Sequence, residues 1–110
     1  MLTPKALDKI IAYTSQLPHA LAVALINSDS EDSSTGDYIG DSYRDLTRIA
    51  DINGALWQQL FIGNKDNLLS VIEDFERRLD EIKNAVKCGD KDKLEEIFGK
   101  AGIRRAALNK

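Results

Sequence analysis

The sequence predicts an all-α protein, a bundle of about five helices, and three observations support this fold class. Apolar residues recur at intervals of three and four along most of the chain, and glycine or proline separates the resulting segments. No segment alternates apolar and polar residues as a half-buried strand would. A length of 110 residues suits one domain, so we expect a single domain over residues 1–110.

The first helix is expected over residues 4–27. Thr3 is suited to cap it, because a threonine hydroxyl accepts a hydrogen bond from the first turn and a proline follows at the first helical position. Pro18 lies in its middle, where a proline removes one backbone hydrogen bond and costs about 3 kcal/mol. We therefore expect the helix to bend or break near Pro18 and to direct Ser15 and His19 toward the edge of a pocket.

The next region is expected to contain a loop and two short helices. Residues 28–37 are polar and rich in turn formers, as in an exposed loop. A short helix should run from residue 40 or 41 to about residue 52, and an Asn-Gly pair separates it from a helix over residues 55–62. A Gly-Asn pair at residues 63–64 ends that helix.

The second half of the chain predicts a long helix followed by a last one. Apolar residues alternate steps of four and three from Leu68 to Val86, and such a stripe packs against another helix or a second subunit. Gly89 ends this helix. Asp92 and Glu95 then have the spacing of a capping box, which would start the last helix.

Charge and composition exclude several classes of partner. Fifteen basic and eighteen acidic residues give a formal charge of -3 with no basic stripe, so we expect no nucleic-acid partner. The longest apolar stretch, residues 20–26, is too short for a bilayer, and we expect neither a membrane span nor a secretory signal. The single cysteine, Cys88, permits no internal disulfide and favours a reducing cytoplasm.

One polar stripe follows the first helix. Asp8, Ser15 and His19 are spaced by seven and four residues, which places them near one helical face. For His19 alone, a partly buried histidine bonded to a backbone carbonyl is the ordinary alternative to a binding role. No second histidine supports a metal site, and no nucleophile stands at a diagnostic spacing.

A second candidate cluster lies on the short helix after residue 40. Asp45 and Arg48 share a helical face, where Asp45 can orient a guanidinium that suits bidentate capture of a carboxylate. An ordinary solvated salt-bridge network, worth at most about 1 kcal/mol per pair, is the alternative. Trp57, judged in isolation, is expected to anchor the core.

Three motifs in order resemble one known family. They read A-Y-T-S-Q-L-P-H-A-L-A, G-D-S-Y-R-D-L-T-R-I-A and N-G-A-L-W, and they are similar to the C-terminal helical domain of prephenate dehydrogenases. The similarity runs from about residue 8 into the long helix and weakens toward the C-terminus. The resemblance implies a fold like the C-terminal domain of 6-phosphogluconate dehydrogenase, with the helices of two chains interleaved in a homodimer.

The same resemblance implies an activity for a larger enzyme. Members oxidatively decarboxylate prephenate to 4-hydroxyphenylpyruvate with NAD or NADP, on the route to tyrosine. Their dinucleotide and their main catalytic histidine belong to an N-terminal Rossmann domain, and this sequence has no G-x-G-x-x-G after a strand. We therefore expect the chain to contain no catalytic residue, to bind no cofactor by itself and to be inactive alone.

Substrate-binding residues are implied by the resemblance as well. They are His19, Arg48, Asp45, Trp57, Ser15 and Asp8. Arg48 matches an arginine that grips a carboxylate of prephenate, and Asp45 the acid that holds it. His19 matches a residue that hydrogen-bonds substrate or helps to place the catalytic group, and Trp57 an aromatic near the pocket. Asp8 matches an acid that reaches a pocket from the neighbouring subunit.

Two other functions remain open from the sequence. The chain could be a noncatalytic helical interaction module that kept the fold, or a small all-helical chorismate mutase. A mutase pocket draws on several cationic residues of its long first helix, where this chain offers only Lys5 and Lys9. The choice between NAD and NADP, the choice between prephenate and arogenate, feedback by tyrosine and a following regulatory domain are also open.

Overall fold

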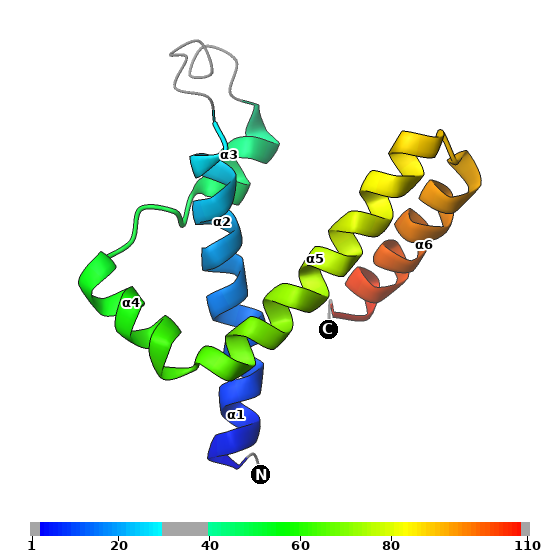
Figure 1. Cartoon of the computed structure of the whole chain (residues 1–110). Helices are drawn as coiled ribbons and strands as arrows, with labels where there is room; N and C mark the ends of the chain where they lie inside the picture. The colour runs from blue at the N-terminus through cyan, green and yellow to red at the C-terminus, as the bar shows by residue number, and fades with distance from the viewer. Residues whose placement is uncertain (1–2, 30–39, 109–110) are drawn as a thin grey trace. The chain divides into compact units, whose positions relative to one another are not determined.

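The computed structural model describes residues 3–29 and 40–108, and these residues form helices and connecting turns without a strand (Figure 1). The elements are α1 (Pro4–Ile11), a π-helical turn η1 (Ala12–Gln16), α2 (Leu17–Asn27), α3 (Asp41–Thr47), α4 (Gly54–Gly63), α5 (Lys65–Cys88) and α6 (Lys91–Leu108). The all-α prediction is confirmed. Most of the loop expected over residues 28–37 lies outside the described residues. The chain divides into two units, Met1–Ile72 and Glu73–Lys110, which are described separately.

The interruption expected near Pro18 takes the form of a wider helical turn instead of a break. In η1 the N–H of Leu17 donates to the carbonyl of Ala12, five residues back, and α2 begins at Leu17 with Pro18 in its first turn. Proline has no N–H and cannot continue the regular hydrogen-bond ladder, and the wider turn directly before it accommodates this interruption. The π-helical turn thus lets one helical run continue from α1 into α2.

The short helix α3 ends five residues earlier than the sequence predicts. It begins at Asp41 as expected but stops at Thr47, whose hydroxyl donates to the carbonyl of Tyr43 at 2.8 Å. The N–H of Ala50 then donates to the carbonyl of Thr47 at 2.9 Å and closes a turn. The next helix, α4, begins at Gly54, one residue before the predicted start, and Asn53 caps it, because its side chain accepts from the N–H of Leu56 at 3.2 Å.

Little of the apolar surface is buried within the chain. The buried apolar residues among those described are Ala12, Leu17, Ala22, Leu68 and Ala85. Large apolar side chains such as Leu7, Ile10 and Leu79 are 42 to 52% exposed. Exposed apolar side chains that lie together on a helix face are typical of a surface that a protein partner covers.

The first helical run also has the length and hydropathy of a membrane span, which the sequence prediction did not expect. Residues Pro4–Asn27 form 24 continuous helical residues, because the π-helical turn joins α1 to α2, and a window of 18 of them has a mean hydropathy of 1.2. Core helices of water-soluble proteins reach the same values. Here α2, the second part of the run, packs against α3. The run also contains the buried side chain of Gln16, whose amide bonds to α4.

The second unit contains the turn between α5 and α6. Gly89 ends α5 with φ +64°, a left-handed conformation that suits glycine, so the predicted end of the long helix is confirmed. The capping residue of α6 is Asp90, whose carboxylate accepts from the N–H of Lys93 at 3.0 Å. The predicted capping box at Asp92 is wrong, because the sharp turn at Gly89 brings the chain into helix two residues sooner.

The cap formed by Asp90 should contribute to the stability of the protein. Replacing Asp90 with alanine removes the cap and should lower the free energy of unfolding by about 1 kcal/mol. Asp92→Ala is the matched control, and it should change the unfolding free energy by less than about 0.5 kcal/mol. Urea denaturation followed by far-UV circular dichroism measures both, and a larger effect at Asp92 would contradict the assignment of the cap.

Ion pairs on α6 are exposed and contribute little. Glu96 lies between Lys93 at 3.4 Å and Lys100 at 3.3 Å. The hydrogen bond from Lys100, and then the charge of Lys93, hold the pKa of the Glu96 carboxyl below its usual range. The small stabilisation is therefore present above the ordinary carboxyl pKa and is lost as the pH falls through the lowered value.

Candidate functional site

His19 and Trp57 form an aromatic pair between α2 and α4. Their ring centroids are 4.0 Å apart with an interplanar angle of 25°, so the rings are stacked. Phe61, one turn further along α4, meets the edge of Trp57 at 6.0 Å and 88°. Both members of the stacked pair are half-buried. The structure therefore joins two of the predicted site residues, which are far apart in sequence.

A hydrogen bond fixes the orientation of the His19 ring. Nδ1 lies 2.8 Å from the carbonyl oxygen of Ser15, and because a carbonyl only accepts, Nδ1 carries the proton. The neutral ring then offers Nε2 as an acceptor, and the protonated ring offers it as a donor. Ser15 is half-buried and contributes its backbone to this arrangement. The bond to a carbonyl matches the ordinary alternative for His19, and it leaves one ring nitrogen for a ligand.

An apolar groove continues from the aromatic pair along α2 and α4. It has a volume of about 470 Å³ and is lined by Ala20, Val23, Ala24, Asn27, Ile52, Gly54, Trp57, Gln58 and Phe61. Trp57 is thus both a packing residue for His19 and part of the groove wall. Such a groove can hold the ring of a small organic molecule or an apolar side chain.

Arg48 and Asp45 lie on and just after α3, which packs against α2. Arg48 is the residue that ends the helix, and both side chains are exposed. No ion pair within 4.0 Å joins their side chains. The expected hold of Asp45 on Arg48 is therefore not formed here. In water such a pair gains little energy, so nothing fixes the two side chains together.

A buried polar cluster at η1 was not predicted from the sequence. Gln16 is only 4% exposed, and its Nε2 donates to the carbonyl of Leu60 in α4 at 3.2 Å. Asn64 donates from Nδ2 to Gln16 Oε1 at 3.0 Å and to the carbonyl of Asp8 at 2.9 Å. The side chain of Asp8 is itself exposed on α1. A glutamine within an apolar helical run is the signal that would have indicated this cluster.

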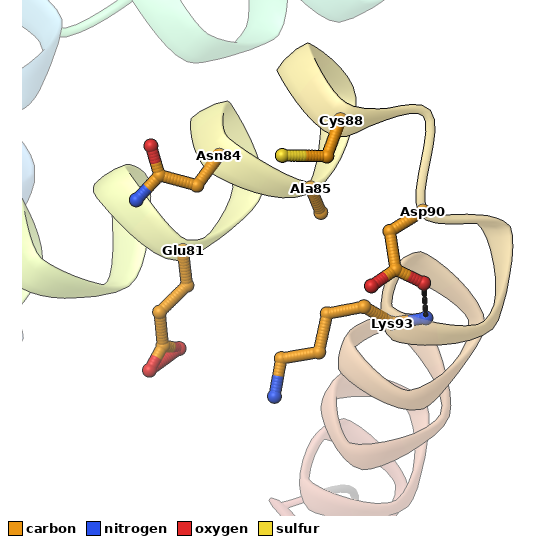
Figure 2. A pocket seen from close by; sticks show the side chains of 6 residues that line it. All are labelled: Glu81, Asn84, Ala85, Cys88, Asp90 and Lys93. Carbon is orange, nitrogen blue, oxygen red and sulfur yellow. Dashed lines mark hydrogen bonds between the residues drawn. The ribbon is translucent and has the colours of Figure 1, made fainter.

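A smaller hollow lies in the second unit at the α5–α6 turn (Figure 2). It has a volume of about 330 Å³ and is lined by Glu81, Asn84, Ala85, Cys88, Asp90 and Lys93. Cys88 is exposed, and Asp90 already accepts from the backbone of Lys93. Across the described ranges, no three His, Cys, Asp or Glu side chains gather closely enough to hold a metal ion. None of the predicted site residues lies in this hollow.

Comparisons with known proteins identify the class of domain. Residues 3–100 match the sequence model of the prephenate dehydrogenase dimerization domain. A cyclohexadienyl dehydrogenase from Zymomonas mobilis is 36% identical over 106 residues, which cover 92% of this chain and 36% of that protein. A prephenate dehydrogenase of known structure from Aquifex aeolicus, in complex with hydroxyphenyl propionate and NAD+, is 29% identical. It covers 98% of this chain and 39% of its own, with a TM-score of 0.84.

A third comparison concerns the fold. The structure of a Synechocystis arogenate dehydrogenase matches 97% of this chain and 41% of its own, with a TM-score of 0.88 and 21% identity. The fold and the sequence match thus define a helical dimerization domain of the kind found in prephenate dehydrogenases. The chain belongs to the prephenate dehydrogenase dimerization-domain family, as the resemblance of its three motifs implies. It spans about a third of the length of the relatives it matches.

The described residues do not provide a dinucleotide site. Dinucleotides bind where a glycine-rich loop joins a strand to a helix, so that helix N–H groups meet the pyrophosphate. Residues 3–29 and 40–108 contain no strand. The described residues therefore do not form a dinucleotide site of that kind.

Proposed function

We propose that this chain is the dimerization and substrate-binding domain of an enzyme that oxidatively decarboxylates prephenate with NAD or NADP. The observation that carries the proposal is the stacked pair of His19 and Trp57 beside an apolar groove, in a chain of this family. The Aquifex aeolicus relative, in complex with hydroxyphenyl propionate and NAD+, supports an aromatic carboxylate as ligand.

The proposed roles follow from the chemistry of each side chain. Nε2 of His19 is available to exchange a hydrogen bond with the substrate, because Nδ1 is held by the Ser15 carbonyl. Arg48 is exposed and able to pair with a substrate carboxylate. Trp57 shields one side of the site, and Asp45 and Asp8 contribute charge at its edges. Hydride transfer and the cofactor belong to a dinucleotide-binding domain.

We also propose that the chain forms a homodimer in the cytoplasm. The family is named for dimerization, and large apolar side chains on the helices of this chain are exposed. Obligate homodimers bury mainly apolar surface in their interfaces, and the exposed apolar side chains of this chain suit such an interface. The single free thiol, Cys88, suits a reducing compartment.

Completing the enzyme tests this function. The chain is fused after a Rossmann domain of a prephenate dehydrogenase, and formation of reduced nicotinamide is followed with prephenate or arogenate and with NAD or NADP. We expect cofactor-dependent turnover by the fusion and none by the chain alone. Comparing the rates for the four combinations of substrate and cofactor shows which substrate and which cofactor the fusion prefers.

Two outcomes would favour the alternatives. A folded, dimeric fusion that turns over neither substrate, while the same Rossmann domain works with a relative's helical domain, would indicate a noncatalytic interaction module. Conversion of chorismate by the chain without cofactor would indicate a mutase.

A further inference from the structure

The aromatic pair has a polar anchor one turn away on both helices. Gln16 precedes His19 by three residues, and Leu60 follows Trp57 by three residues, so the two contacts are neighbours on each helix. The two helices run in opposite directions at this point: Gln16, the earlier residue of its helix, bonds to Leu60, whereas the later His19 stacks on the earlier Trp57. The hydrogen bond therefore fixes the position of α4 along α2 at the point where the rings meet.

The side chain of Gln16 has little freedom to do anything else. It is 4% exposed, its Nε2 donates to the Leu60 carbonyl at 3.2 Å, and its Oε1 accepts from Asn64 at 3.0 Å. A buried amide without partners would be costly, so both bonds favour one position of the side chain. Asn64 is held in turn by the Asp8 carbonyl and by Asn67, which donates to Asn64 Oδ1 at 2.9 Å.

The π-helical turn adds a reason for this placement. Gln16 is the last residue of η1, and π-helical turns shift the register of the residues that follow them. The turn thus places Gln16 toward α4 and His19 toward Trp57 on the same side of the run. A stack alone would fix α4 only weakly, since ring pairs are worth about 1 kcal/mol.

We propose that Gln16 is a positioning residue, which holds α4 in register with α2 so that Trp57 stacks on His19 and Nε2 of His19 is presented to the ligand. The importance of this arrangement for catalysis rests on the proposed function. The arrangement itself is a property of the chain and can be measured without substrate.

The chain provides its own probe for the test. It contains one tryptophan and one histidine. Any effect of a histidine on the emission of Trp57 as the pH changes therefore comes from this pair. The protonated form of an imidazole stacked on an indole quenches the emission of the indole, so the emission is recorded from about pH 8 to about pH 5. The measured quantity is the amplitude of quenching across that range in the 110-residue chain.

Gln16→Met removes both hydrogen bonds and keeps a side chain of similar length. We expect the quenching amplitude to fall at least about twofold, because α4 loses its register on α2. Gln59→Met, an exposed glutamine on the same helix as Trp57, is the matched control and should keep the native amplitude. Far-UV circular dichroism verifies that each variant remains helical.

An unchanged amplitude in helical Gln16→Met would overturn the proposal. Where that variant fails to fold, Asn64→Ala decides instead. It leaves the bond from Gln16 to Leu60 but removes the second anchor, so a smaller decrease is expected and an unchanged amplitude would again overturn the proposal. Because no turnover is measured, this result is independent of whether the completed enzyme acts on prephenate.

Discussion

Arg48→Ala is expected to weaken prephenate binding by the completed enzyme by about 30-fold to several thousand-fold. That range corresponds to the loss of about 2 to 5 kcal/mol when an arginine paired with a desolvated carboxylate is removed. The effect should fall mainly on KM, because the carboxylate is bound equally in the ground and transition states. Steady-state kinetics with varied prephenate concentration measures it.

The controls for this prediction lie on the same short helix. Arg44 is also exposed on α3, and Arg44→Ala should leave KM unchanged. Arg48→Lys keeps the charge but not the planar fork, so its KM should lie between those of the native protein and the alanine variant.

Because Arg48 is exposed, the size of the change in KM distinguishes a carboxylate-binding arginine from an ordinary surface charge. In the isolated chain its guanidinium is exposed and has no ion pair with Asp45, so as a surface charge it would be worth about 1 kcal/mol or less. A KM increase of less than about fivefold would correspond to that surface value. The assignment of Arg48 to the carboxylate would then fail.

The chain should sediment as a dimer at tens of micromolar, and a charge on its exposed apolar stripe should dissociate it. Leu79 lies on the stripe of α5 and is 52% exposed. In a monomer, Leu79→Glu would change stability by about 0.5 kcal/mol or less, as surface substitutions do. Within a subunit interface it would cost several kcal/mol, because a carboxylate would replace buried apolar surface.

The matched control lies outside the family match. Ile103 is 75% exposed on α6, beyond residues 3–100, so Ile103→Glu should preserve the dimer. Sedimentation equilibrium over a range of concentrations distinguishes the two variants. A native chain that is a folded monomer at tens of micromolar would contradict the proposal.

Much of the fold could be predicted because local patterns decide it. Thr3 caps the first helix as the sequence predicts, and Gly89 ends the long helix in a left-handed conformation. The errors arose where two local signals compete. Asp90 and Asp92 are both possible caps, and only the path of the chain after Gly89 selects Asp90.

The candidate site was predictable in part. The motifs identified His19 and Trp57 as candidate site residues. Their contact could not be predicted from sequence spacing, because the two residues lie on different helices. The expected pair of Asp45 and Arg48 is not formed, because helical spacing permits an exposed ion pair without stabilising it. Gln16 escaped notice because its role depends on the Leu60 carbonyl, which is a backbone group without a sequence signature.

The sequence by itself determined that this protein is helical, where most helices begin and end, and which family it resembles. These features depend on side-chain spacing and on hydrogen bonds within a few residues. Only the tertiary structure decided that a π-helical turn accommodates Pro18, that Gln16 is buried, and that His19 stacks on Trp57. The last two depend on how α4 packs against the first helical run, and packing between distant segments is not encoded in local periodicity.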